Sequence, residues 1–171
     1  MGKKSVKENK NIYFLAREEL ELTRAAASEL MPGYSESMIE KLENERCVIE
    51  PEDVLAMSKA YKRPDLCNHY CAKECPIGVN TVPEIKVESL SEIVLGLLST
   101  TNSFESKKNK LIDISVDGEI TEEELADYIM IQDELDKMAI SINAFKLWID
   151  QKIASGSIDQ EKINKIKDAH L

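Results

Sequence analysis

Apolar side chains recur every three or four residues along the second half of the chain, in a longest series from Tyr128 to Ile149. An α-helix completes a turn in 3.6 residues, so this spacing gathers the side chains into one stripe of a helix, whereas a strand would need strict alternation. Only six glycines and five prolines occur in 171 residues. We therefore predict an all-α protein. The stripe consists of Tyr128, Ile131, Leu135, Met138, Ile142, Phe145 and Ile149, and Leu125, Ile129 and Trp148 widen it.

Helix-breaking residues and composition divide the chain into four parts. Residues 1–10 are rich in lysine, and we expect either a flexible basic arm that follows DNA phosphates or a disordered, solubilising terminus. Residues 11–78 have the pattern of four to five short helices, the last of them rich in cysteine. Residues 79–88 are expected to be a linker. Residues 89–171 are expected to form a hairpin or bundle of long helices with a short helix at the end.

Capping residues predict where the short helices begin. We expect a first helix over residues 11–20, with Arg17 on its solvent side. Thr23 and Ser35 precede the second and third helices, where a hydroxyl can accept hydrogen bonds from the free amides of the first turn. Pro51 suits the first turn of a fourth helix. The pattern thus indicates two short capped helices, joined by a tight turn, ahead of the fourth helix.

Several short pieces of this region match a known pattern. They are Leu22-Thr23 before the second helix, Gly33-Tyr34-Ser35 in the turn, Ile39-x-x-Leu42-Glu43-Asn44 ending the third helix, and Val54–Ala60 in the fourth. With these pieces, residues 11–75 resemble the lambda-repressor and Cro-like family, of the xenobiotic-response-element (XRE) type. The resemblance implies a helix-turn-helix domain that binds double-stranded DNA, with its third helix in the major groove. It also implies a cytoplasmic bacterial regulator of transcription.

The resemblance further implies which residues contact DNA. The start of the second helix would contact the phosphate backbone, and the third helix would contact base edges and phosphates. The sequence departs from the family pattern in a turn lengthened at Pro32, in Glu45 where a glycine usually ends the third helix, and in the acidic Glu36 and Glu40. The implied contact residues are Arg24, Ser35, Glu36, Ser37, Lys41, Asn44 and Arg46.

The charge balance bears on this function because DNA affinity depends on cations that meet phosphates. The chain has a formal net charge of −10. Through Arg63, however, 11 lysines and arginines stand against 12 acidic residues, so most of the negative charge lies in the second half. The acidic balance also leaves an alternative from another class, a non-enzymatic protein-interaction module that keeps the helix-turn-helix fold.

The four cysteines suggest three alternatives. Cys67, Cys71 and Cys75 are spaced so that a helix would turn them to one side, and Cys47 could approach from a connector. Such a set could hold zinc. Packing as small apolar side chains is the favoured interpretation, however, because three ligands on one rigid helix converge poorly on one ion. A redox or disulfide role is the third possibility, and a thiol-responsive switch would follow from it.

Residues 113–124 match the twelve-residue calcium loop of an EF-hand in ligand spacing and in a central glycine. A calcium-responsive switch would follow. The favoured interpretation is a helix stop at Gly118 followed by a Thr-x-x-Glu capping box, which explains most of the same residues. The calcium ligands would be Asp113, Ser115, Asp117, Glu119 and Glu124.

Two long amphipathic helices cannot bury all their apolar surface against each other. We expect a homodimer through residues 89–154, in which two hairpins form a four-helix bundle. A dimer would also suit DNA, because two reading helices on a two-fold axis address two half-sites. An intramolecular three-helix bundle with the last short helix is the alternative. A further use of this half is to sense an effector, which the sequence does not identify.

Several function classes lack support in the sequence. The two histidines, His69 and His170, belong to no recognisable triad, and no glycine-rich phosphate loop occurs, so we expect no enzymatic activity and no cofactor. The longest apolar run, Ile93–Leu98, is far shorter than the ~20 residues that span a bilayer. No signal peptide is evident. We therefore expect a cytoplasmic protein that does not associate with membranes.

Overall fold

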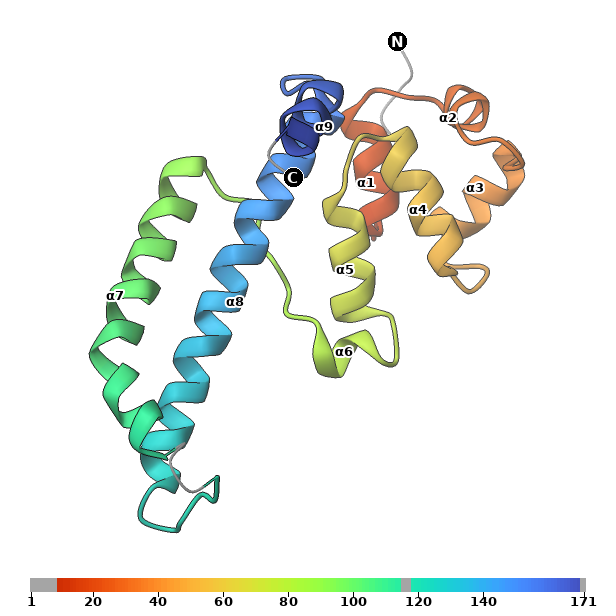
Figure 1. The fold of residues 1–171 in the computed structure, drawn as a ribbon. Coiled ribbons are helices and arrows are strands. Elements are labelled where there is room, and N and C mark those ends of the chain that lie inside the picture. Colours follow the sequence, from red (N-terminus) through yellow and green to blue (C-terminus); the bar gives the residue numbers. More distant parts are fainter. Residues whose placement is uncertain (1–8, 115–117, 170–171) are drawn as a thin grey trace. The chain divides into compact units, whose positions relative to one another are not determined.

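The computed structural model describes residues 9–114 and 118–169, and this part of the chain forms nine helices and no strand (Figure 1). The all-α prediction is confirmed. Six short helices come first, two long helices follow, and a ten-residue helix comes last. The helices are α1 Ile12–Glu19, α2 Arg24–Leu30, α3 Glu36–Glu43, α4 Pro51–Ala60, α5 Asp65–Lys73, α6 Gly78–Thr81, α7 Leu90–Ile114, α8 Leu125–Ala154 and α9 Gln160–Ala169.

The helices group into two compact units. The first unit contains α1 to α6, the whole of α9 and the last turn of α8. The second unit is residues 85–149. The sequence placed residues 150–171 with the hairpin, whereas the described residues among them, 150–169, group with the first unit. None of the helices in the described ranges is long and apolar enough to cross a membrane.

The predicted linker over residues 79–88 begins within a short helix, because Gly78–Thr81 form α6. This helix approaches α5 very closely. A Cβ atom at Gly78 would lie 2.1 Å from the carbonyl oxygen of Cys71, so only glycine allows the approach. A four-residue helix held by such a contact has no periodic pattern that sequence analysis could detect.

Side chains cap α2 and α3 as the sequence predicted. The Ala26 amide donates to Thr23 Oγ1 at 3.1 Å, and the Met38 amide donates to Ser35 Oγ at 3.2 Å. Each hydroxyl satisfies a backbone donor that has no partner within its own helix. The beginnings of the two helices are therefore encoded locally.

Three helices, α1, α3 and α4, end at a non-glycine residue in the left-handed conformation. After α3, the Glu45 amide donates to the Leu42 carbonyl at 3.2 Å and the Arg46 amide donates to the Lys41 carbonyl at 2.9 Å. These are the two hydrogen bonds of the Schellman motif, in which glycine usually takes the left-handed position. Glu45 thus takes the left-handed position at which the family pattern named above usually has glycine. The three left-handed residues are Glu21 (φ 54°), Glu45 (φ 55°) and Lys62 (φ 55°).

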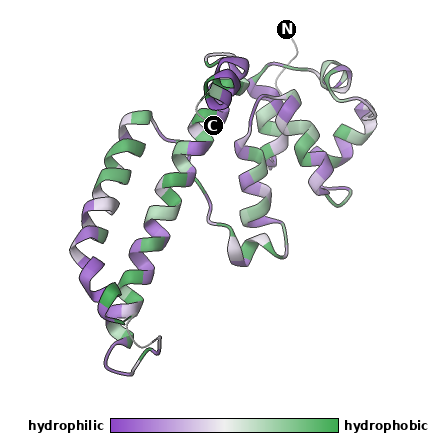
Figure 2. Ribbon diagram, in the orientation of Figure 1, coloured by the Kyte–Doolittle hydropathy of each residue, from purple (hydrophilic) through white to green (hydrophobic). Residues whose placement is uncertain are grey.

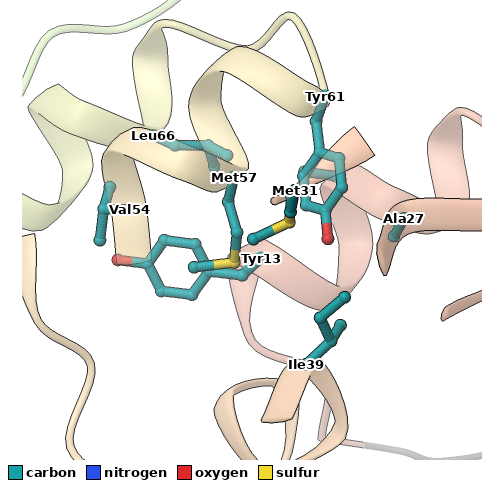
Figure 3. Packing of buried hydrophobic residues seen from close by; sticks show 9 residues of the cluster. Tyr13, Ala27, Met31, Ile39, Val54, Met57, Tyr61 and Leu66 are labelled. Atoms are coloured by element: carbon teal, nitrogen blue, oxygen red, sulfur yellow. The ribbon is translucent and has the colours of Figure 1, made fainter. Parts of the chain in front are cut away.

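The core of the first unit combines side chains from α1 to α5 (Figure 3). Met31 lies directly after α2 and Tyr61 directly after α4, so two of the nine core side chains come from helix ends. The buried cluster is Tyr13, Ala16, Ala27, Met31, Ile39, Val54, Met57, Tyr61 and Leu66.

The second unit is an antiparallel pair of long helices, α7 and α8 (Figure 1). Lys107 pairs with Glu134 at 2.9 Å, and Lys110 pairs with Asp127 at 2.5 Å. Because the partner number falls as the lysine number rises, the pairs define the antiparallel register. A small cluster at the other end, formed by Ile85, Ile93, Ala144 and Leu147 with Trp148 beside it, completes the packing.

Capping boxes precede both long helices. The Ser89 amide donates to Glu92 Oε2 at 2.9 Å and the Glu92 amide donates back to Ser89 Oγ at 3.3 Å. Thr121 and Glu124 make the same reciprocal pair at 3.0 and 3.4 Å. Both predicted boxes are confirmed.

Candidate nucleic-acid interface

The turn between α2 and α3 is held to the body of the first unit. Gly33 has a φ of +90°, which a residue with a Cβ rarely adopts. Ser28 Oγ donates to the Tyr34 carbonyl oxygen at 2.6 Å, and the Tyr34 hydroxyl donates to Asp53 Oδ1 at 2.8 Å. Burial and the Asp53 carboxylate raise the pKa of Tyr34 to about 12, so the hydroxyl keeps its donor proton at neutral pH. These bonds join the turn to α2 and to α4.

Helix α3 has one fully buried face and one outward face. Ile39, Leu42 and Glu43 are 0% exposed. Ser37 and Lys41, which are four residues apart and therefore adjacent on one side of the helix, are exposed. The helix is thus held firmly from behind while a serine and a lysine point outward.

A buried ion-pair network fixes α3 against α1 and α2. Arg17 of α1 donates to both carboxylate oxygens of Glu43, through Nε to Oε1 and through Nη2 to Oε2 at 2.9 Å. Arg24 of α2 adds a bond from Nε to Glu43 Oε2 at 2.8 Å. Arg17 Nη1 also donates to the Leu22 carbonyl at 2.6 Å. Burial has the largest single effect on the pKa of Arg17 and lowers it. The hydrogen bonds and the negative charge of Glu43, with smaller contributions from Tyr61 and Glu18, together exceed that effect, so the pKa is raised above its usual value.

This network corrects one expectation from the sequence. Arg17 was expected in solvent, but it is 6% exposed. A periodicity argument assigns arginine to the outer face because an unpaired charge is costly to bury. It cannot detect a carboxylate 26 positions later that neutralises the charge.

Phe14 lies among three cations at the same place. Lys10 Nζ lies 5.0 Å from the ring centroid, and the guanidinium carbons of Arg17 and Arg24 lie 4.9 and 5.5 Å from it. Lys10 also pairs with Glu18 at 2.6 Å. The last lysine of the predicted basic arm is therefore bound to α1. Residues 1–8, with the other three lysines of the arm, lie outside the described residues.

The predicted contact residues on α3 and next to its two ends are exposed or half-buried. Glu36 and Ser37 are exposed in the first turn, and Ser35 is exposed just before it. Arg46 has a 66% exposed side chain and lies 3.5 Å from Glu40, measured from Nη1 to Oε1. Asn44 is half-buried, and its Nδ2 donates to the Glu40 carbonyl at 2.7 Å.

Arg24 differs from the other predicted contact residues because it is engaged within the unit. Its Nε is bound to Glu43, and 31% of its side chain is exposed. The remaining part of the guanidinium is directed by that bond rather than free to rotate. A phosphate contact from Arg24 would therefore come from a preorganised group.

The outward side of α3 and its end carry a nearly balanced set of charges. Lys41 and Arg46 stand against Glu36, Glu40 and Glu45, so the formal sum is −1. Such a surface attracts phosphate weakly by itself.

The cysteines do not gather into a recognisable metal site. Among the described residues, no three side chains of histidine, cysteine, aspartate or glutamate are placed to hold a metal ion. Cys47, Cys67, Cys71 and Cys75 are free thiols of intermediate exposure. Burial raises the pKa of the Cys71 thiol, and the neighbouring Cys75 and Cys67 add to the rise. A raised thiol pKa lowers reactivity at neutral pH.

The proposed calcium ligands are only partly described. Ser115 and Asp117 lie outside the described residues, whereas Asp113 and Glu119 are exposed. The Glu124 carboxylate accepts from the Thr121 amide and hydroxyl at 3.0 and 2.8 Å. Glu124 thus has the capping role that the favoured interpretation gave it. His170 also lies outside the described residues.

Two features of this site were missed by sequence analysis. One is the Arg17–Glu43–Arg24 network, and the other is the bond from Tyr34 to Asp53. A signal for the first was present, because Glu43 follows Leu42 and lies four residues after Ile39, which places it at the edge of the apolar face of α3. No comparable signal marks Tyr34.

The chain matches no protein-family model, and no curated protein or solved structure shows significant similarity to it. The resemblance of residues 11–75 to the lambda-repressor-like family therefore stays a prediction. The geometry of α1 to α5 is the basis on which function is proposed.

Proposed function

We propose that the first unit binds double-stranded DNA in a sequence-specific way and that the protein regulates transcription in the bacterial cytoplasm. The observation that carries the proposal is the construction of α3. Its inner face is fully buried, its outward face presents Ser37 and Lys41, and a fixed turn joins it to α2. A short, rigid helix of this kind fits the major groove, which is ~12 Å wide.

The side chains on α3 have the chemistry of base-edge contacts. Lys41 can donate to guanine O6 and N7, and Glu36 can accept from the cytosine amino group. Ser37 can donate or accept. Arg24, whose Nε is bound to Glu43, and the exposed Arg46 can each donate to phosphates.

The nearly balanced charge of this surface sets the expected salt dependence. Three cations, Arg24, Lys41 and Arg46, are available per chain from the predicted contact set. Each neutralised phosphate contributes about −0.9 to the slope of log affinity against log salt concentration. We therefore expect a slope of about −3 per chain, with a substantial part of the specificity coming from base contacts.

The experiment first selects duplexes from a random pool with the full-length protein and then measures their binding by fluorescence anisotropy. Lys41→Ala should weaken binding of the selected duplex about tenfold or more, which corresponds to ~1–3 kcal/mol. Lys59→Ala, which removes an exposed lysine of α4, is the control with the same change of net charge. Equal losses in the two variants, or no duplex enriched by the parent, would contradict the proposal.

A second variant tests whether α3 reads bases. Repeating the selection with Glu36→Gln should change the preferred base at one position from cytosine towards adenine, because glutamine pairs with the adenine N6 and N7 edge. A purely electrostatic role of Glu36 would instead raise affinity for every duplex and leave the preferred sequence unchanged.

The carboxylates on the same surface favour a second candidate function. Glu36, Glu40 and Glu45 would attract a basic surface of a protein partner. Under this function the selection enriches no duplex. A protein captured by the parent, and lost when Glu36 and Glu40 are both changed to glutamine, would identify this alternative.

A further inference from the structure

The outward side of α4 borders an open apolar hollow. This hollow, of about 350 Å³, lies between α4 and the end of α2. Leu30 at the end of α2 and Leu55 of α4 are 52% and 51% exposed beside it. Val54 and Met57, on the other side of α4, lie in the core (Figure 3). The apolar lining of the hollow is Leu30, Met31, Pro32, Leu55 and Ala56.

One carboxylate and one ammonium group lie at the two ends of the apolar part of α4. Glu52, Leu55, Ala56 and Lys59 follow one another at spacings of three, one and three residues, which places all four on one face of the helix. Glu52 and Lys59 also line the hollow, and seven residues of helix separate them by about 10 Å. Figure 2 shows hydrophobic residues in the middle of α4 and hydrophilic residues towards its ends.

Both charges are unpaired within the part of the chain that the structure describes. Glu52 and Lys59 are exposed, and their side chains make no hydrogen bond or ion pair there. Asp53, the other carboxylate of α4, is instead buried and accepts from the Tyr34 hydroxyl at 2.8 Å. The two charges that flank the apolar residues are therefore available to a partner outside the chain.

The order of these four residues makes the face complementary to itself. The midpoint of the series lies between Leu55 and Ala56. A two-fold axis through that point places Glu52 of each copy opposite Lys59 of the other, and Leu55 of each copy opposite the small Ala56 of the other. Two parallel α4 helices would instead oppose like charges. An unrelated helix would have to carry the same order of residues to fit, whereas a second copy carries it necessarily.

We propose that the outward side of α4 binds the same side of a second copy of this chain, with the two α4 helices antiparallel about a two-fold axis. Leu55 of each copy enters the hollow of the other, between Ala56 and Leu30, and two equivalent Glu52–Lys59 pairs close the ends. Exposed ion pairs contribute little to affinity. The apolar contacts therefore supply most of the affinity, and the charges select the antiparallel orientation. This inference does not depend on DNA binding.

The test is the mass of the full-length protein in solution without DNA, measured by light scattering over a concentration series. The parent should reach twice the 19.3 kDa of one chain. Glu52→Lys should weaken self-association about tenfold or more, because like charges then face each other at both ends of the interface. Glu123→Lys makes the same change of charge at an exposed residue outside this face. This control should associate as the parent does.

Two further variants separate the charges from the apolar contact. Lys59→Glu alone should weaken association as Glu52→Lys does, whereas the double variant restores opposite charges at both ends and should recover it. The double variant also has the net charge of the parent. Leu55→Lys places a charge at the centre of the interface and should weaken association about tenfold or more. Far-UV circular dichroism confirms that each variant keeps its helices.

A monomeric parent would overturn the proposal and would leave this face to a different protein or to the second unit of the same chain. A dimeric parent that Glu52→Lys and Leu55→Lys leave unchanged would overturn it as well, and would place the contact elsewhere, as in the dimer that the sequence predicts through residues 89–154. A double variant that does not recover association would overturn the antiparallel arrangement.

The test is kept separate from the DNA experiment, in which Lys59→Ala is the control. That comparison is made at a protein concentration at which light scattering gives the parent and Lys59→Ala the same mass. A difference in DNA affinity between Lys41→Ala and Lys59→Ala then reflects contacts with DNA alone.

Discussion

Arg17 and Glu43 join α1 to α3 by a two-point ion pair in the interior of the first unit, where Glu43 is 0% exposed and Arg17 6%. A planar guanidinium that meets a carboxylate through two parallel bonds is the strongest geometry for such a pair. Arg24 binds the same carboxylate from α2. One side chain of α3 is therefore bound by both α1 and α2.

Removing one partner of this pair should be strongly destabilising. Glu43→Leu leaves the buried Arg17 without its carboxylate, and we expect the free energy of unfolding to fall by about 3–5 kcal/mol, because a buried unpaired charge is costly. Urea unfolding followed by circular dichroism measures the loss. The double variant Arg17→Met with Glu43→Leu should recover most of it, since both charges are then gone. A double variant as unstable as Glu43→Leu would show that the ion pair is not the source of the loss.

The left-handed residue after α3 offers a stabilising substitution. Glu45→Gly should raise the free energy of unfolding by about 0.5–1 kcal/mol, because a Cβ in this conformation costs ~1–2 kcal/mol and the added freedom of glycine in the unfolded chain offsets part of the gain. Thermal unfolding is the measurement. Glu45→Ala is the control that removes the charge but keeps the Cβ, and it should give no such gain. Equal gains in both would attribute the effect to charge.

Two buried tyrosines should respond oppositely to loss of the hydroxyl. The Tyr61 hydroxyl is buried and has no hydrogen-bond partner among the described residues, so Tyr61→Phe should leave stability unchanged or raise it. The Tyr13 hydroxyl donates to Glu74 Oε1 at 2.8 Å, so Tyr13→Phe should cost about 1 kcal/mol or more. Urea unfolding near pH 7 makes the comparison. Burial raises the pKa of Tyr61 to about 12, so its ionisation does not contribute at that pH.

The hairpin should lose stability in acid through Glu134. The Glu134 carboxylate accepts hydrogen bonds from Lys107, Ser103 and Lys137, of which the bond from Lys107 has the largest effect. These bonds lower the pKa of Glu134 from 4.5 to about 2. A depressed pKa means that the stabilisation is complete above pH ~4.5 and is lost as the pH falls towards ~2.

The measurement is thermal unfolding at a series of pH values between these limits. Glu134→Gln should remove most of the decline, whereas Asp133→Asn, at an exposed neighbouring position, should keep it. An identical pH profile for the parent and Glu134→Gln would place the acid sensitivity elsewhere in the chain.

Much of the local structure follows from the sequence, because the signals that set helix ends act within four residues. Thr23, Ser35, Ser89 and Thr121 all cap the helices that follow them. The apolar series in α8 likewise requires nothing beyond the helical period. These interactions are the same whatever the rest of the chain does.

The candidate site could be placed on α3 but not explained from the sequence. The exposed positions of Glu36, Ser37 and Lys41 follow from helical geometry once Ile39 and Leu42 are assigned to the core. The engagement of Arg24 and the burial of Arg17 do not, since both depend on a glutamate 19 and 26 residues away. A charge can be assigned to the interior only when its partner in space is known.

The sequence by itself therefore determined the helical class, the capped starts of its helices and the face of α3 that points outward, because each depends on neighbours along the chain. The tertiary structure alone decided that Arg17 is buried, that Gly78 brings α6 onto Cys71, and that α7 covers Ile131 while leaving Ile142 exposed. Those outcomes depend on pairs of residues far apart in the sequence. Their energies arise only when folding brings the two members together and removes water from between them.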